Sequence, residues 1–329
     1  MRTAGGPQLA AVAELGGERL RSLLDATERL LHGVADGHGE RLAAHVADTL
    51  DAGGKRLRPT LVYIAAGEAS SDHLVDAGAA VELLHMATLV HDDVLDRAEL
   101  RRGRATVFAR GGRLDATATG DLLFSRAFAV LAATGNAEAV HALSDASSAL
   151  ARGELMQRDD AFSPAVTAER YLERCRLKTA RLFEAACRLG ALLGDPGAGA
   201  AGPLGEFGER IGIAFQVFDD VLDVSGPTER TGKTRGADLL DGTVTLPLIL
   251  ARERDPELRA LDLRSAATDA AGAAELCDRI AATGALEDAR EHALGHVAAG
   301  KAALDGLDLG GAQRELLDLV ADGVIERYA

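Results

Sequence analysis

The chain has 329 residues, of which 47% are hydrophobic, and its 36 basic against 51 acidic side chains give a net charge of −15. The hydrophobic fraction suits a globular protein with a sizeable core, and the acidity excludes a nucleic-acid backbone as partner. Aromatic residues make up 3% and Trp is absent, which argues against stacking platforms for single strands. An anionic ligand would therefore need metal ions or a local basic patch.

The cysteines and the N-terminus indicate the compartment. Cys175, Cys187 and Cys277 form no CxxC pair, which favours a reducing environment without disulfides or a zinc site. The N-terminal residues make a poor signal peptide, and no window of roughly 18 uninterrupted apolar residues predicts a transmembrane segment. We therefore expect a soluble, cytoplasmic protein.

Helical periodicity runs through most of the chain and predicts an all-α protein. The expected helices cover residues 74–98, 115–133, 137–156, 167–193, 203–224 and 243–254, with Gly or Pro at the breaks. Residues 51–59, 101–112 and 225–242 are expected to form ordered loops. No linker divides the chain, so we expect one domain over residues 1–329, whose last part, 255–329, is helical without identifiable chemistry.

The strongest pattern in the sequence is DDVLD, which occurs twice within apolar helical segments. The first aspartate cluster comprises Asp92, Asp93 and Asp96, and the second comprises Asp219, Asp220 and Asp223. In each cluster the first and last Asp lie four residues apart, so they share a helix face and repel each other. A single such cluster is more often a solvated acidic face, but two copies favour divalent cations. Several Mg²⁺ ions held between two carboxylate faces would suit a diphosphate.

Basic and polar side chains accompany both clusters. Residues 53–59, GGKRLRP, place three cations after two glycines, an arrangement that suits an anion site although a solvated helix start explains it too. Other candidates follow the same logic, each weak alone. Arg101 and Arg102 follow the first cluster, Lys178 and Thr179 lie on a helix with an apolar face, Gln216 shares the face of Asp219, and His85 that of Asp92. Lys233 lies in the loop after the second cluster.

Taken together, these motifs resemble the trans (all-E) isoprenyl diphosphate synthases, also called polyprenyl synthetases. The resemblance rests on GGKRLRP at 53–59, LLHMATLVHDDVLDRAELRRG at 83–103, GDLLF at 120–124, LKTARLF at 177–183, and the stretch from FQVFDDVLD to GTVTLPLI at 215–249. It covers most of residues 50–250 in the family's order. It implies a homodimeric bundle of roughly ten or more helices around a central cavity.

The resemblance also implies the reaction and the role of each residue. Isopentenyl diphosphate would condense with an allylic diphosphate (dimethylallyl, geranyl, farnesyl or geranylgeranyl) after Mg²⁺-assisted ionisation. The six aspartates would bind metal. Four residues would bind isopentenyl diphosphate: Lys55, Arg58, His85 and Arg102, with Arg56 in the same loop. Five would contact the allylic diphosphate: Arg101, Lys178, Thr179, Gln216 and Lys233, of which all but Thr179 are expected to take part in catalysis. No side-chain nucleophile is needed.

Alternatives remain beside this interpretation. A class I terpene cyclase would carry a different second metal motif and more aromatic residues. A silent regulatory subunit would tend to lose the aspartate clusters, and a metal-free helical scaffold would not need them.

The expected product is an all-trans polyprenyl diphosphate of C25 or longer, with geranylgeranyl diphosphate (C20) as the alternative. In the family a large aromatic four or five positions before the first Asp closes the tunnel, and here Thr88 and Ala87 are small. Leu84 would flank the same tunnel, and Phe124 or Phe128 could form its floor. The two residues between the Asp pair and the last Asp are typical of the medium- to long-chain branch.

Overall fold

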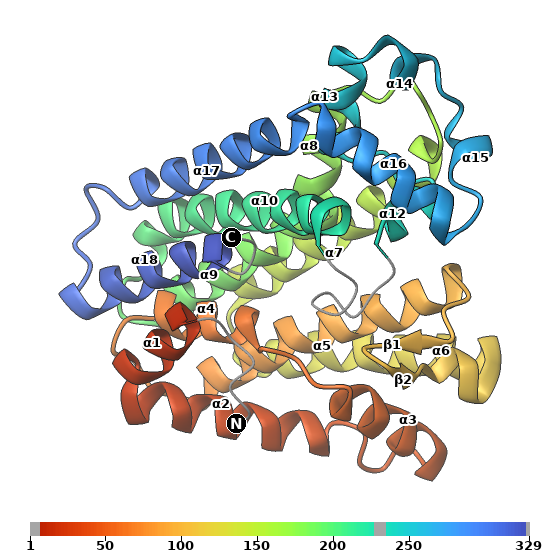
Figure 1. Ribbon diagram of the computed structural model, residues 1–329. Coiled ribbons are helices and arrows are strands. Elements are labelled where there is room, and N and C mark those ends of the chain that lie inside the picture. The colour runs from red at the N-terminus through yellow and green to blue at the C-terminus, as the bar shows by residue number, and fades with distance from the viewer. Residues whose placement is uncertain (1–6, 227–234, 327–329) are drawn as a thin grey trace. The chain divides into compact units, whose positions relative to one another are not determined.

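The computed structural model describes residues 7–226 and 235–326 and is built almost wholly of helices (Figure 1). The all-α prediction is confirmed. The chain groups into two compact units. Unit 1 comprises residues 1–147, 182–205 and 306–319, and unit 2 comprises residues 148–181, 206–305 and 320–329. The single-domain organisation expected from the sequence stays a prediction.

The first half of the chain supplies most of unit 1. Its elements are α1 (Pro7–Leu15), α2 (Gly17–Gly33), α3 (Glu40–Asp51), α4 (Leu57–Ala65), α5 (Asp72–Leu95), the strands β1 (Leu100–Arg101) and β2 (Arg104–Ala105), α6 (Val107–Ala132) and α7 (Ala137–Asp160), which runs on into unit 2. Helices α5 and α6 pack along each other, and α2 and α4 pack on α5.

The second half of the chain supplies most of unit 2. Its elements are α8 (Ala168–Cys175), the π-helical turn η1 (Arg176–Ala180), α9 (Arg181–Leu193), the short 3-10 turn η2 (Ala198–Ala200), α10 (Ala201–Ser225), α12 (Ala237–Leu240), α13 (Leu246–Arg254), α14 (Pro256–Ala260), α15 (Leu263–Ala266), α16 (Ala270–Ala282), α17 (Ala285–Ala303) and α18 (Gly311–Glu326). Most of α9 and the first turns of α10 and α18 belong to unit 1.

Side-chain caps explain where three of the long or functional helices begin. Ser71 before α5, Thr106 before α6 and Thr167 before α8 each accept a hydrogen bond from a backbone N–H of the first turn. Such a cap satisfies one of the donors that the helix itself leaves unpaired. These caps therefore fix where the three helices begin.

Helix α5 is the core of unit 1. It is apolar on all sides, and Leu74, Leu83 and Leu84 are wholly buried. Among the described residues it is also the one helix long and apolar enough to cross a membrane, yet 72% of its most apolar window is buried inside the protein. Burial of this kind is what a central core helix requires.

Several boundaries differ from the sequence prediction, among them the loop expected at 225–242, which contains α12, and three others that lie near the predicted site residues. Helix α5 ends at Leu95 rather than at residue 98, so Asp96 is its C-cap residue. The loop expected at 101–112 is instead part of the hairpin β1–β2 followed by the start of α6, interrupted where Gly112 has a φ of 71°. The helix expected at 167–193 contains the π turn η1, because one turn there is wider than an α-helical turn.

Candidate active site

The first aspartate cluster lies at the C-terminal end of α5. Asp92 is half-buried, Asp96 is exposed, and the backbone N–H of Asp96 donates to the carbonyl of Asp92 at 2.8 Å. The end of a helix presents unpaired carbonyl groups and a partial negative charge. Carboxylates added at this end repel that charge as well as each other, so a bound cation would stabilise the cluster.

The middle residue of this cluster has a protein partner. Asp93 is 4% exposed, and its Oδ1 lies 2.9 Å from Nε and 2.8 Å from a terminal nitrogen of Arg101, which follows in the hairpin. Burial raises the pKa of Asp93, and the Arg101 guanidinium opposes that rise. The hairpin thus brings Arg101 onto the first cluster, and its predicted contact with the allylic diphosphate stays a prediction.

The basic loop before α4 is built around Arg56. This residue has a left-handed backbone, with φ 48° and ψ 36°, and its guanidinium bonds Glu82 at 2.9 Å and Glu28 at 3.2 Å. Glu82 is 4% exposed and lies on α5, and Glu28 lies on α2. Two carboxylates therefore occupy the Arg56 side chain and fix the loop against α2 and α5.

Arg58 and Arg102, two more of the predicted substrate-binding residues, lie near His85. Arg58 stacks on the ring of Phe183 at 4.6 Å, and burial lowers its pKa to about 10, which leaves it cationic at neutral pH. The guanidinium of Arg102 donates to the carbonyl of Gly53 in the basic loop. Burial lowers the pKa of His85 well below its usual value, and the charges of Arg58 and Arg102 lower it further. The structure thus brings together three of the residues predicted to bind isopentenyl diphosphate, with a neutral imidazole among arginines. Lys55 is exposed in the same loop.

The second aspartate cluster lies in the last two turns of α10. Asp220 is 4% exposed; its Oδ2 accepts a hydrogen bond from the Tyr171 hydroxyl at 2.7 Å, and its Oδ1 accepts one from Gln216 Nε2 at 2.8 Å. Burial raises the pKa of Asp220 to about 7, although both hydrogen bonds favour its charged form. Asp223 Oδ2 accepts from the backbone N–H of Asp238 at 3.2 Å, and Asp219 is half-buried.

The π turn η1 carries the two predicted substrate residues that follow α8. Thr179 Oγ1 donates to Gln216 Oε1 at 2.8 Å, which joins the turn to α10. The Lys178 ammonium forms an ion pair with Glu154 and donates to Gln157 Oε1 at 3.2 Å, both on α7. π turns inside helices occur frequently at functional sites, because they redirect side chains without ending the helix. Lys178, Thr179 and Gln216 are therefore held together within unit 2.

A close backbone approach accounts for a glycine on α7. A Cβ added to Gly153 would lie 2.6 Å from the backbone nitrogen of Lys178 and 2.9 Å from its Cα. Non-bonded contacts of a Cβ atom this short are essentially never found in proteins. The backbone of Lys178 cannot move aside as a flexible side chain could. Gly153 thus lets η1 pack directly on α7.

Comparison with known proteins decides the family. The sequence model of the polyprenyl synthetases matches residues 40–280. The chain belongs to the polyprenyl synthetase family. It is 41% identical over 278 residues to the heptaprenyl diphosphate synthase component 2 of Geobacillus stearothermophilus, which covers 82% of this chain and 85% of that protein. It is 37% identical to the geranylgeranyl diphosphate synthase of Methanosarcina mazei, covering 84% and 87%.

A solved structure agrees with this assignment. The polyprenyl synthase of Caulobacter crescentus CB15, complexed with calcium and isoprenyl diphosphate, matches with a TM-score of 0.89 and 32% identity over 100% of both chains. The resemblance inferred from the sequence motifs is thereby confirmed at the level of family and fold.

The residues predicted to set product length in this polyprenyl synthetase lie on α5 and α6. Leu84 and Ala87 are wholly buried, whereas Thr88 is half-buried and its hydroxyl donates to the carbonyl of His85 at 2.7 Å. Phe124 and Phe128 stack with ring centroids 5.2 Å apart, and Phe124 is 38% exposed. Of Leu84, Ala87 and Thr88, only Thr88 is partly exposed.

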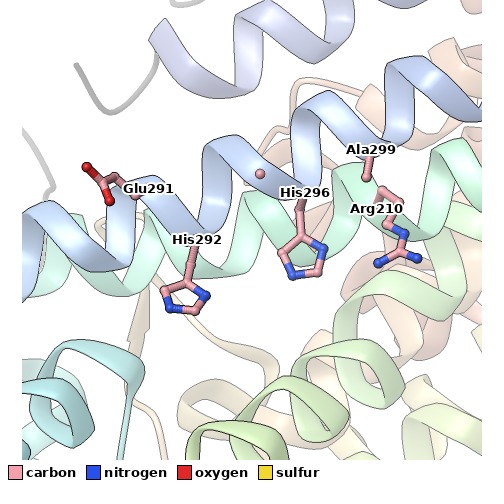
Figure 2. A pocket seen from close by; sticks show the side chains of 6 residues that line it. Arg210, Glu291, His292, His296 and Ala299 are labelled. Carbon is pink, nitrogen blue, oxygen red and sulfur yellow. The ribbon is translucent and has the colours of Figure 1, made fainter.

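One predicted site residue and one pocket remain to be placed. Lys233 lies outside the described residues. A pocket between α10 and α17 is lined by Arg210 and by His292 and His296, whose rings project from the same side of α17 (Figure 2). None of the predicted site residues that the structure describes lines this pocket, so it belongs to no part of the predicted site.

Five residues that bind predicted site side chains were not predicted from the sequence. Glu28 and Glu82 fix Arg56, Glu154 and Gln157 hold Lys178, and Tyr171 binds Asp220. Glu82 had a weak signal, since it lies three residues before His85 on the same helix and within an apolar stretch. The other four lie far along the chain from the side chains that they contact, and nothing in the local pattern marks them.

The carboxylates of the two aspartate clusters are suitable ligands for Mg²⁺, although the described residues do not form a complete coordination site by themselves. No three His, Cys, Asp or Glu side chains in the described ranges already converge as a metal site. The donors in both clusters are carboxylate oxygens near helix C-termini, which is the ligand type that Mg²⁺ prefers. Mg²⁺ also commonly takes one or two carboxylates and completes its shell with water and substrate phosphates. The two clusters therefore fit the cation.

Proposed function

We propose that this chain is a prenyltransferase that condenses isopentenyl diphosphate with an allylic diphosphate to give an all-trans polyprenyl diphosphate. Family membership supports the reaction class. The observation that carries the proposal is the pair of aspartate clusters, each at a helix C-terminus and each accompanied by arginine, lysine or amide side chains. A diphosphate needs this combination, because the protein's own acidity would repel the anion unless bound cations and basic side chains neutralised its charge.

We assign the metal to the outer aspartates of the two clusters. Asp92, Asp96, Asp219 and Asp223 would hold several Mg²⁺ ions with the substrate diphosphate, and the buried Asp93 and Asp220 would complete the six-residue set from within each helix. When bound, the metal would supply charge stabilisation to the leaving diphosphate as the C–O bond breaks. The Caulobacter relative is complexed with calcium, which supports a divalent cation in that protein.

The basic residues divide between the two substrates. Lys55, Arg58, His85 and Arg102 would bind isopentenyl diphosphate, and Arg101, Lys178, Thr179, Gln216 and Lys233 would contact the allylic diphosphate. Arg56 lies in the same loop as Lys55 and Arg58, but Glu28 and Glu82 occupy its guanidinium. It would shape the basic loop and leave the phosphate contacts to Lys55 and Arg58.

Positioning and electrostatics would supply the catalysis. The side chains around the clusters bind and orient two anions, and the cations among them stabilise charge on the departing diphosphate. The allylic carbocation is then attacked by the double bond of isopentenyl diphosphate, and a proton is lost. None of these steps requires a nucleophilic side chain.

For the product, C25 or longer is favoured over C20. The small Thr88 and Ala87 before the first cluster support the longer product, as does the similarity to a heptaprenyl synthase component. The similarity to a geranylgeranyl synthase keeps C20 as the alternative.

Replacing Thr88 by Phe should shorten the main product by at least one C5 unit, because the half-buried site can accept the ring. Ala87→Phe should do the same but at a cost in stability, because overpacking a wholly buried site costs about 1–3 kcal/mol. Product sizing by mass spectrometry checks both variants, and an unchanged product in folded Thr88→Phe would exclude this gate.

A homodimer in the cytoplasm is the proposed working state. The name "component 2" of the Geobacillus relative makes a second, unlike subunit the alternative for this chain.

The decisive experiment incubates the purified chain alone with Mg²⁺, isopentenyl diphosphate and an allylic primer, and sizes the extracted product. Polyprenyl diphosphate from the chain alone would support the proposal. A cyclic hydrocarbon, or no product with any primer, would reject it in favour of a cyclase or a silent subunit.

A further inference from the structure

A buried tyrosine connects the second aspartate cluster to the rest of unit 2. Tyr171 is 0% exposed, and its hydroxyl donates to Asp220 Oδ2 at 2.7 Å. The other oxygen of Asp220 accepts from Gln216 at 2.8 Å, and Gln216 in turn accepts from Thr179 at 2.8 Å. One hydrogen-bonded chain thus runs from α8 through α10 to the π turn that carries Lys178.

The tyrosine ring is itself fixed in place. The guanidinium of Arg174 lies 5.4 Å from the ring centroid. Arg174 is also buried, and it donates to the carbonyl of Val244 at 2.6 Å. A ring held by a cation on its face and packed on all sides keeps one orientation. Its hydroxyl is therefore a preorganised donor rather than one that must find Asp220 from several rotamers.

We propose that Tyr171 is a positioning residue for metal binding at the second aspartate cluster, acting through the carboxylate of Asp220. This inference rests on the proposed function for its biological meaning. Asp220 lies on α10 between Asp219 and Asp223, so fixing its carboxylate fixes the turn of helix that presents both. The same hydrogen-bonded chain fixes Gln216 and Thr179 relative to that turn.

The neutrality of the donor matters for this role. A buried carboxylate must be hydrogen-bonded, because an unsatisfied one loses its hydration without compensation. A cation at this position would satisfy Asp220 but would also cancel negative charge in the cluster. A hydroxyl and an amide satisfy it without adding a positive charge that would compete with divalent cations.

The direct test is Tyr171→Phe, with Tyr63→Phe as a matched control. Tyr63 is likewise 0% exposed, and its hydroxyl bonds Thr27 in unit 1, so the control removes the same group from an equally buried ring. Mn²⁺ binding is measured calorimetrically with inorganic pyrophosphate present. We expect the apparent affinity for Mn²⁺ to be about tenfold weaker in Tyr171→Phe, which is the scale of one hydrogen bond to a charged group. The affinity of the control should be unchanged. The Mg²⁺ concentration for half-maximal activity and the KM for the allylic substrate should rise, with the KM for isopentenyl diphosphate unchanged.

A second measurement follows binding in the unmodified protein, and the Phe variants serve only to assign its signals. The chain contains three tyrosines, so ring-labelled ¹³C-tyrosine gives a small set of NMR signals that the two Phe variants assign. Adding Mg²⁺ and pyrophosphate should shift the Tyr171 signal and leave that of Tyr63 in place. An unmoved Tyr171 signal, or Mn²⁺ binding that is unchanged in Tyr171→Phe or weakened equally in Tyr63→Phe, would overturn the inference. Metal binding that depends on Tyr171 in a protein without prenyl transfer would instead reject only the proposed function.

Discussion

The carboxylate of Asp93 on α5 binds a guanidinium, whereas that of Asp220 on α10 accepts hydrogen bonds from a hydroxyl and an amide. Both occupy the same place in the same five-residue motif, and both are 4% exposed. The partner of Asp93 comes from the hairpin that follows it, eight residues later, and the Tyr171 partner of Asp220 lies 49 residues earlier in the chain. Identical local sequences therefore acquire different electrostatics, because their partners come from different elements.

The difference suggests a division of labour between the clusters. Arg101 places a positive charge beside the first cluster, where it can also reach a bound phosphate, so anion and metal would be held together there. At the second cluster a hydroxyl and an amide, rather than a guanidinium, bind the middle aspartate, and the Lys178 ammonium lies on the π turn η1. The following experiments test that division, beginning with the largest expected effect.

Removing an outer aspartate from either cluster should give the largest loss. Asp92→Ala and Asp219→Ala are each expected to lower kcat by at least about 100-fold, the scale of losing a preorganised charge stabiliser. Steady-state turnover at saturating Mg²⁺ is the measurement, with circular dichroism to establish folding. Wild-type turnover in either folded variant would mean that only one cluster takes part.

Arg58 and Lys178 should act on different substrates. Arg58→Ala should raise the KM for isopentenyl diphosphate about tenfold, and Lys178→Ala should raise that for the allylic substrate by a similar factor, since each removes one charged contact to a phosphate. Each substrate is varied at a saturating level of the other. If Arg58→Ala affected the allylic substrate alone, the two assignments would have to be exchanged.

The glycine that supports the π turn should be more sensitive than its counterpart beside the first cluster. A Cβ at Gly153 meets the Lys178 backbone at 2.6 Å, while one at Gly120 meets the His91 ring at 2.3 Å. The ring can rotate away, but the backbone cannot. We expect Gly153→Ala to lower stability by about 1–3 kcal/mol and to raise the allylic KM severalfold. Thermal melting and kinetics beside Gly120→Ala provide the comparison, and equal effects in the two variants would contradict this account of η1.

The two buried aspartates should differ in their effect on stability with pH. The pKa of Asp220 is raised from an ordinary value of 3.8 to about 7, so between these values the folded protein holds a proton that the unfolded chain has lost. The free energy of unfolding must then fall as pH rises through this window. Asp220→Asn removes the effect and should gain stability relative to wild type between pH 5 and pH 8, on the order of 1 kcal/mol.

Asp93→Asn is the matched comparison. Burial raises the pKa of Asp93 too, but Arg101 opposes the rise, so its gain over the same pH range should be smaller. Thermal melting in EDTA at both pH values measures the two variants without metal. A gain at Asp93 that equals or exceeds that at Asp220 would show that the guanidinium does not offset the burial.

Much of the fold and of the site was predictable from the sequence because its signals are local. The i, i+4 aspartates, the apolar stretch before Asp92 and the capping residues Ser71 and Thr167 all act within one or two helical turns. The same periodicity predicted that Gln216 shares a helix with the second cluster. What it could not predict is the break at η1, because a π turn is stabilised by packing against Gly153 on another helix.

The sequence by itself therefore determined the helical class, the family, the two aspartate clusters and the basic residues near them. The tertiary structure decided which partners within the protein those side chains have. Arg56 is taken up by Glu28 and Glu82, Lys178 by Glu154, and Asp220 by Tyr171. The physical reason is that charge and spacing repeat along a helix and can be read locally, whereas a buried polar group must find its partner wherever the packing brings one within hydrogen-bonding distance.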